Sequence, residues 1–125
     1  MKYLILLMTL ILALTGCGSK ESGFRQISMD EATKLMETEE NFILLDVRTQ
    51  EEYAEKHIPG AICIPNETIG TQMPAQLPDK DQLILVYCRS GNRSKQAAGK
   101  LAAMGYTNVT EIGGINSWKG DLILP

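Results

Sequence analysis

The fold of this 125-residue chain is decided by one stretch, Val86-Tyr87-Cys88-Arg89-Ser90-Gly91-Asn92-Arg93-Ser94. The apolar run at residues 83–87 ends at Cys88, a polar loop with a central glycine follows, and residues 95–104 have the pattern of a helix that ends at Gly105. A strand, a tight loop and a helix N-terminus in this order point several backbone N–H groups into the loop, where the helix dipole adds partial positive charge. The stretch therefore predicts an anion-binding loop.

Cys88 stands where the strand is expected to end, with Arg89 and Arg93 close by in the sequence. Most cysteines in such places are small buried hydrophobic residues. A packed core, however, does not require two arginines and a glycine within a few residues. A thiol beside positive charge and a helix N-terminus has a lowered pKa and reacts as the thiolate. We therefore predict that Cys88 is a nucleophile.

The N-terminal residues have the features of an export signal. Lys2 precedes an apolar run at residues 3–14, which is too short to span a bilayer as a helix. The run leads into Leu14-Thr15-Gly16-Cys17, which resembles the bacterial lipobox. This resemblance implies that a signal peptide, residues 1–16, is removed, that Cys17 carries diacyl lipid and often palmitate, and that the protein is anchored outside the cytoplasm to a bacterial membrane. Residues 17–23 then form a lipidated tether.

Composition narrows the range of partners. The formal net charge is −3 and no basic stripe is present, which argues against nucleic acid as a partner. The chain has three cysteines and one histidine without paired metal-ligand spacing, so we expect no metal and no other cofactor. A length of 125 residues fits one compact domain, expected here as a monomer.

Strands alternate with helices along residues 24–125. Strands are expected at residues 24–27, 42–47, 61–64, 83–87 and 109–112, with Cys63 in the core and a turn at Gly113-Gly114. Helices are expected after the capping boxes Ser28-x-x-Glu31 and Thr49-x-x-Glu52, ending near residues 38 and 56, and a brief one capped by Asn66 is expected to end near residue 73. The nearly unbroken apolar run at residues 42–47 is typical of a parallel strand buried on both faces. The pattern predicts an α/β fold with a parallel sheet, in which Asp46 and Cys88 lie at the carboxyl ends of strands, where ligands bind.

Several motifs in this order resemble the rhodanese domain, over nearly all of residues 24–120. They are Asp46-Val47-Arg48, Glu52-Tyr53, His57-Ile58-Pro59-Gly60-Ala61, the stretch from Cys88 to Ser94, and Gly113-Gly114 with Trp118 downstream. Lys56 departs from the pattern, since many relatives have glycine before the histidine. The resemblance implies a single three-layer domain with a five-stranded parallel sheet and helices on both faces.

The resemblance also implies a rhodanese-type thiosulfate sulfurtransferase. Cys88 would take the outer sulfur of thiosulfate, or of a similar small anionic donor, and hold it as a persulfide until a thiol or cyanide acceptor removes it. The substrate-binding residues would be Arg89, Ser90, Gly91, Asn92, Arg93 and Ser94: their backbone N–H groups stabilise the anion, the Ser94 hydroxyl adds a hydrogen bond, and the two arginines orient the donor. Asp46 and Arg48 would support the loops through ion pairs, often with a partner such as Glu52, and His57 would make a structural hydrogen bond.

Three alternatives remain at this point. Four residues separate Cys88 from Arg93, whereas related phosphatases have a longer loop that suits phosphate, so sulfur chemistry is favoured. The chain would also fit a persulfide carrier or an anion-binding interaction module that does not turn over. A third alternative is redox exchange through a Cys63–Cys88 disulfide, since exported proteins meet an oxidising compartment. This bond requires Cα atoms within about 7 Å of each other.

Overall fold

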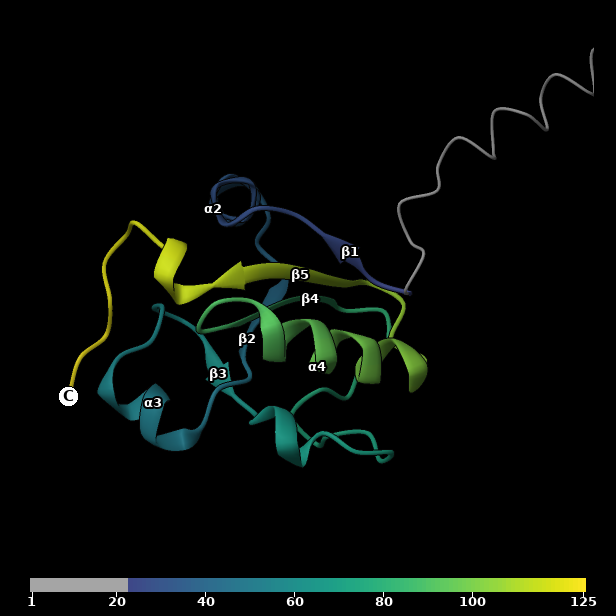
Figure 1. The fold of residues 1–125 in the computed structure, drawn as a ribbon. Helices are drawn as coiled ribbons and strands as arrows, with labels where there is room; N and C mark the ends of the chain where they lie inside the picture. The colour runs from purple at the N-terminus through teal and green to yellow at the C-terminus, as the bar shows by residue number, and fades with distance from the viewer. Residues whose placement is uncertain (1–22) are drawn as a thin grey trace, which may run out of the picture.

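The computed structural model describes residues 23–125, which form one five-stranded, all-parallel sheet with strand order β1-β5-β4-β2-β3 (Figure 1). The strands are β1 (Arg25–Gln26), β2 (Phe42–Asp46), β3 (Ile62–Cys63), β4 (Leu83–Cys88) and β5 (Val109–Gly114). The helices are α2 (Met29–Thr38), α3 (Gln50–Glu55), α4 (Asn92–Ala103) and the 3-10 helices η1 (Asn66–Thr68) and η2 (Ile115–Ser117). The predicted α/β fold with a parallel sheet is confirmed.

The predicted signal peptide and the lipid site at Cys17 lie outside the described residues, as does all of the tether except Gly23. Within residues 23–125, no helix has the length and apolar character needed to cross a membrane.

Helices cover both faces of the sheet, as predicted, because the side chains of each central strand alternate between two cores. Figure 1 shows α2 on one side of the sheet and α4 on the other. In β4, Ile84, Val86 and Cys88 belong to the core under α4. Leu85 and Tyr87 belong to the core that includes Met29 and Ala32 of α2. The alternation places the Cys88 side chain on the α4 face.

The two predicted capping boxes are present. Ser28 and Thr49 accept hydrogen bonds from the backbone N–H groups of Glu31 and Glu52, whose carboxylates bond back to the cap residues. Each box satisfies two backbone donors at a helix start and fixes the first turn of α2 or α3.

Three predicted elements differ from the structure by two residues or more. Helix α4 begins at Asn92 rather than at residue 95, since Gly91 adopts a left-handed φ of 115° and turns the chain directly into the helix. Asn66 opens only a three-residue 3-10 helix and does not cap it, because its side chain bonds to Gln96 and Lys100 of α4 instead. The residues Gly113-Gly114, expected as a turn, form the end of β5.

An irregular register joins β4 to β5 beside the loop. Val86 pairs with Glu111 but Cys88 pairs with Gly114, so β5 has one more residue than β4 in this interval. Bulges of this kind re-aim side chains next to functional sites. The end of β5 also lies very close to the loop, because a Cβ built on Gly114 would stand 2.1 Å from the Arg89 carbonyl oxygen.

We predict that Gly114→Ala destabilises the protein by at least about 1–3 kcal/mol, the usual cost of overpacking a tight contact. Urea unfolding measures the change. Gly70→Ala is the matched control, since no atom lies within 4 Å of a Cβ at this position. Equal unfolding midpoints for the two variants would contradict the close approach of β5 to the loop.

Candidate active site

The sulfur of Cys88 lies inside the loop that joins β4 to α4. The side chain is 1% exposed. The backbone N–H of Gly91 donates to Sγ at 3.0 Å, and the Ser94 hydroxyl oxygen lies 3.4 Å from Sγ. Burial alone would raise the pKa of the Cys88 thiol, but hydrogen bonds involving the Ser94 side chain and the backbone of Ser94, Gly91 and Ser90 outweigh burial and lower this pKa. The loop therefore favours the thiolate.

Gly91 makes this geometry possible. Its φ of 115° lies in the region that side-chain-bearing residues rarely adopt, and its N–H points at the sulfur while its carbonyl accepts the Lys95 N–H in the first turn of α4. The N-terminal end of α4 adds partial positive charge at the sulfur. The predicted arrangement of strand, loop and helix N-terminus is what the chain adopts.

Glu111 is a site residue that the sequence analysis missed. It lies on β5 and is 3% exposed. Its Oε2 atom is 2.5 Å from Ser94 Oγ and accepts the Gly113 N–H at 2.9 Å. A carboxylate within the predicted strand at residues 109–112 was the available signal, because Glu is almost never fully buried unless it is paired.

Arg93 points to a protein carboxylate. Its guanidinium donates to both oxygens of Glu52, at 2.7 and 3.1 Å, so α3 and α4 are tied together at the site. The Arg93 hydrogen bond is the main cause that lowers the pKa of Glu52 to about 2. Much of the charge of Arg93, which was expected to orient the donor, is therefore balanced within the protein.

Asp46 and Arg48 form a buried ion pair beside the loop. Arg48 Nη2 lies 2.7 Å from Asp46 Oδ2, and it also donates to the Lys56 carbonyl at 2.7 Å. The Arg48 guanidinium lies over the ring of Tyr87, 5.9 Å from its centroid. The predicted third partner, Glu52, is the capping-box residue of α3 and pairs with Arg93 instead. The Asp46–Arg48 pair fixes the segment between β2 and Lys56.

The remaining loop residues face solvent. Arg89, Ser90 and Asn92 are exposed. Arg89 borders a small hollow of about 230 Å³ together with Arg48, Glu52, Glu55, Lys56, Ile115 and Asn116. Of the loop's two arginines, Arg89 is the one exposed at its mouth.

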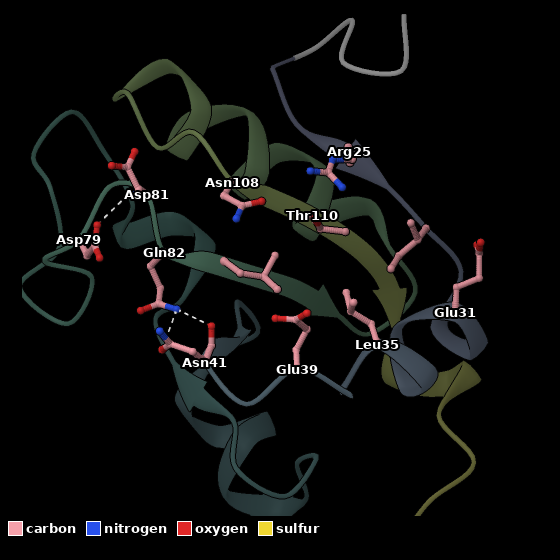
Figure 2. A pocket seen from close by; sticks show the side chains of 12 residues that line it. Arg25, Glu31, Leu35, Glu39, Asn41, Asp79, Asp81, Gln82, Asn108 and Thr110 are labelled. Atoms are coloured by element: carbon pink, nitrogen blue, oxygen red, sulfur yellow. Dashed lines mark hydrogen bonds between the residues drawn. The ribbon is translucent and has the colours of Figure 1, made fainter. Parts of the chain in front are cut away.

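A larger hollow, about 650 Å³, is remote from this chemistry (Figure 2). Its lining includes Arg25, Gln82, Asn108 and Thr110, and none of the residues from Cys88 to Ser94 belongs to it. It opens where β4 and β5 begin, whereas Cys88 lies at the other end of β4.

The structure does not bring Cys63 and Cys88 together, and both thiols are free. Strand β2 lies between β3 and β4, so the two cysteines are separated by two strand spacings, about 9.6 Å. A disulfide requires Cα atoms within about 7 Å, so the predicted redox alternative is wrong for this fold. Cys63, expected in the core, is half-buried, and its thiol points to the carbonyls of Arg48 and Thr49.

His57 has the structural contacts that its motif implies. Its Nδ1 atom lies 2.8 Å from the Tyr53 carbonyl oxygen and its ring stacks on the Tyr53 ring. Its backbone pairs with Ile123. These contacts join the end of α3 to the C-terminal segment.

The two described thiols should differ in reactivity. Burial, followed by the Asp46 carboxylate, raises the pKa of Cys63 to about 11. Its thiolate fraction at pH 7 is then on the order of one in ten thousand. We predict that a neutral alkylating reagent labels Cys88 near neutral pH and labels Cys63 only as the pH approaches 11, as peptide mass spectrometry would show. Urea-unfolded protein, in which both label alike, is the control, and equal labelling of the folded protein at pH 7 would contradict the prediction.

Comparisons with known proteins agree with this geometry. The family model described as "Rhodanese-like domain" matches residues 28–121. The thiosulfate sulfurtransferase PspE of Escherichia coli (strain K12) is 38% identical over 81 residues, which are 65% of this chain and 74% of the relative. A sulfurtransferase of Allochromatium vinosum is 36% identical over 94 residues, 74% of this chain and 86% of the relative.

One solved structure is also similar to this chain. The structure described as "rhodanese with anions from E. coli" matches with a TM-score of 0.61 and a sequence identity of 35%. The match covers 66% of this chain and 98% of the chain in that structure. From these matches and from the five-stranded parallel sheet, this chain belongs to the rhodanese-like domain family.

Proposed function

We propose that this protein is a sulfurtransferase, which moves sulfane sulfur from thiosulfate or a similar donor to a thiol or cyanide acceptor through a Cys88 persulfide. The observation that carries the proposal is the Cys88 sulfur, held by the Gly91 N–H at 3.0 Å and by Ser94 at the N-terminus of α4. The relatives named sulfurtransferases support the same reaction class.

In the first step, the Cys88 thiolate attacks the outer sulfur of thiosulfate. A bond forms between Cys88 Sγ and this sulfur, the bond from the outer sulfur to the sulfonate breaks, and sulfite leaves with the electron pair. The negative charge of the thiolate moves to the terminal sulfur of the persulfide. No external oxidant or reductant is consumed, because the sulfane sulfur is transferred at its own oxidation level.

In the second step, an acceptor thiolate or cyanide attacks the terminal sulfur, and Cys88 leaves as the thiolate. The loop assists both steps because its backbone N–H groups already face the sulfur and do not have to reorganise as charge moves. The same donors that lower the pKa of Cys88 also make it a better leaving group.

Arg89 is the residue we assign to attract the anionic donor. Its side chain is exposed at the mouth of the loop, whereas Arg93 is bidentate on Glu52. A guanidinium that is not already paired gains more from an incoming anion.

We propose further that the reaction takes place outside the cytoplasm at a bacterial membrane, with the domain held by lipid on Cys17. The support is the sequence alone, Leu14-Thr15-Gly16-Cys17 after an apolar run. Metabolic labelling with a palmitate analogue tests the anchor: label on wild type and none on Cys17→Ser is expected, and an unlabelled wild type would refute it.

Turnover separates an enzyme from a carrier. With thiosulfate and cyanide in excess, we predict many equivalents of thiocyanate per protein and none with Cys88→Ser, measured by colorimetric thiocyanate assay. At most one equivalent of thiocyanate from folded wild type would favour the persulfide carrier and contradict the enzyme. Release of phosphate from a phosphate ester, without thiocyanate, would favour the phosphatase alternative.

The proposed role of Arg89 predicts a specific kinetic effect. Arg89→Ala should raise KM for thiosulfate about 10- to 150-fold, the value of one charge-assisted hydrogen bond, with a smaller change in kcat. Lys95→Ala removes an equal charge from an exposed position on α4 and should leave KM unchanged. Equal effects of the two substitutions would show that general charge, rather than Arg89, attracts the donor.

A further inference from the structure

The large hollow of Figure 2 is lined by α2 and by the segments at which β4 and β5 begin. Its volume, about 650 Å³, is within the range of small-molecule sites. The apolar part of its lining consists of Ile27, Leu35 and Leu83, and the rest is polar or charged. An apolar surface with polar groups around it is the usual composition of a ligand site.

Acidic side chains dominate the charge of the hollow. Among residues 23–125 its lining has the carboxylates of Glu31, Glu39, Asp79 and Asp81 and one guanidinium, that of Arg25. Four negative charges against one positive charge leave this lining with a formal net charge of −3. All five side chains are exposed, and no ion pair of the described residues includes any of them. The hollow therefore attracts a cation.

Thr110 presents a hydroxyl without a partner to this hollow. Its side chain is 2% exposed, and no hydrogen bond joins Oγ1 to another group of residues 23–125. Every side-chain nitrogen or oxygen of these residues that is sealed from solvent does have a partner, so Thr110 Oγ1 must reach the open space that Thr110 lines, which is the hollow. Buried hydroxyls are normally hydrogen-bonded. What fills the hollow must supply the partner.

One side of the hollow is a row of side chains on α2. Glu31, Leu35 and Glu39 are spaced by four residues, so they share a helix face, and about 12 Å of helix rise separates the first from the last. Asp79 and Asp81 lie across the hollow from this row, in the loop before β4 (Figure 2). Carboxylates thus stand on both sides of an apolar strip.

The polar groups left for a ligand are mainly acceptors. Gln82 Nε2 already donates to the carbonyl and to Oδ1 of Asn41, at 2.8 and 3.3 Å, which leaves the Gln82 carbonyl oxygen. Asp79 Oδ1 accepts the Asp81 N–H at 2.9 Å, and this bond holds the two aspartates together. An ionised carboxylate only accepts hydrogen bonds. The ligand that fits is rich in donors as well as cationic.

We propose that this hollow binds a linear organic polyamine. Its ammonium groups pair with carboxylates on the two sides of the hollow, and its methylene chain lies on Leu35 and Leu83. Each ammonium group has up to three donors, so one of them also serves Thr110 Oγ1. A ligand with a single ammonium group would satisfy only one side.

The site is separate from the proposed sulfur chemistry. None of the residues from Cys88 to Ser94 lines the hollow, and Cys88 lies at the other end of β4. Polyamine binding needs neither a sulfur donor nor an acceptor. The inference therefore goes beyond the proposed function, and failure of sulfur transfer would leave it standing.

Amide NMR spectra of the full chain during a titration with spermidine test the site. We expect saturable shifts of the amides that line the hollow, those of Leu83, Asn108 and Thr110 among them, and no comparable shift at Cys88. Absence of saturable shifts at millimolar spermidine would overturn the proposal. A peptide with two lysines is the second probe: tighter binding of this peptide than of spermidine would assign the ammonium groups to a protein and overturn the free polyamine.

A matched pair of double variants separates the site from general charge. Glu39→Gln with Asp79→Asn removes one carboxylate from each side and should weaken spermidine binding about 2- to 30-fold, the combined value of two exposed ion pairs. Glu37→Gln with Asp121→Asn removes the same charge from exposed positions outside the lining and should leave binding unchanged. Equal weakening by the two double variants would overturn the site.

Two single substitutions should act in opposite directions. Arg25→Gln removes the guanidinium of the lining and should tighten spermidine binding about 1.5- to 5-fold. Thr110→Val removes the hydroxyl and should weaken binding about 2- to 10-fold, the value of one hydrogen bond. Its urea-unfolding midpoint should not fall, since this hydroxyl has no partner among residues 23–125. Weaker binding by Arg25→Gln, or unchanged binding by folded Thr110→Val, would contradict the proposed contacts.

Discussion

The hydrogen bonds that hold the Cys88 sulfur depend on the left-handed backbone of Gly91. At a φ of 115° this residue starts α4 directly after the loop, points its own N–H at the sulfur and brings Ser94 into the first turn of the helix. A residue with a side chain would be strained at this φ, and the loop would open. The Gly91 N–H, the Ser94 hydroxyl and the N-terminal end of α4 meet at the sulfur because the turn is this tight.

Two ion pairs near the loop hold the surrounding segments in place, and they are not the source of the reactivity of Cys88. Glu52 and Arg93 join α3 to α4, and Asp46 and Arg48 fix the chain beyond β2. Both pairs balance charge within the protein, and Arg89 is left exposed at the mouth of the loop.

Local patterns in the sequence predicted the parts of the molecule that are themselves local. The capping boxes at Ser28 and Thr49, the buried run of β2 and the junction at Cys88 are confirmed, since each depends on neighbouring residues. The partnership of Arg93 with Glu52, 41 residues apart, and the approach of Glu111 to Ser94 depend on how helices and strands pack. The separation of Cys63 from Cys88 follows from strand order, which no local pattern encodes.

The most direct test of the account is the intact mass of the full chain after incubation with thiosulfate, and again after addition of cyanide. The account predicts that wild type gains the mass of one sulfur atom, that cyanide removes it, and that Cys88→Ser gains nothing. A folded protein whose Cys88 thiol alkylates at neutral pH yet takes up no sulfur would contradict it. The loop would then be an anion site that does not form the persulfide from this donor.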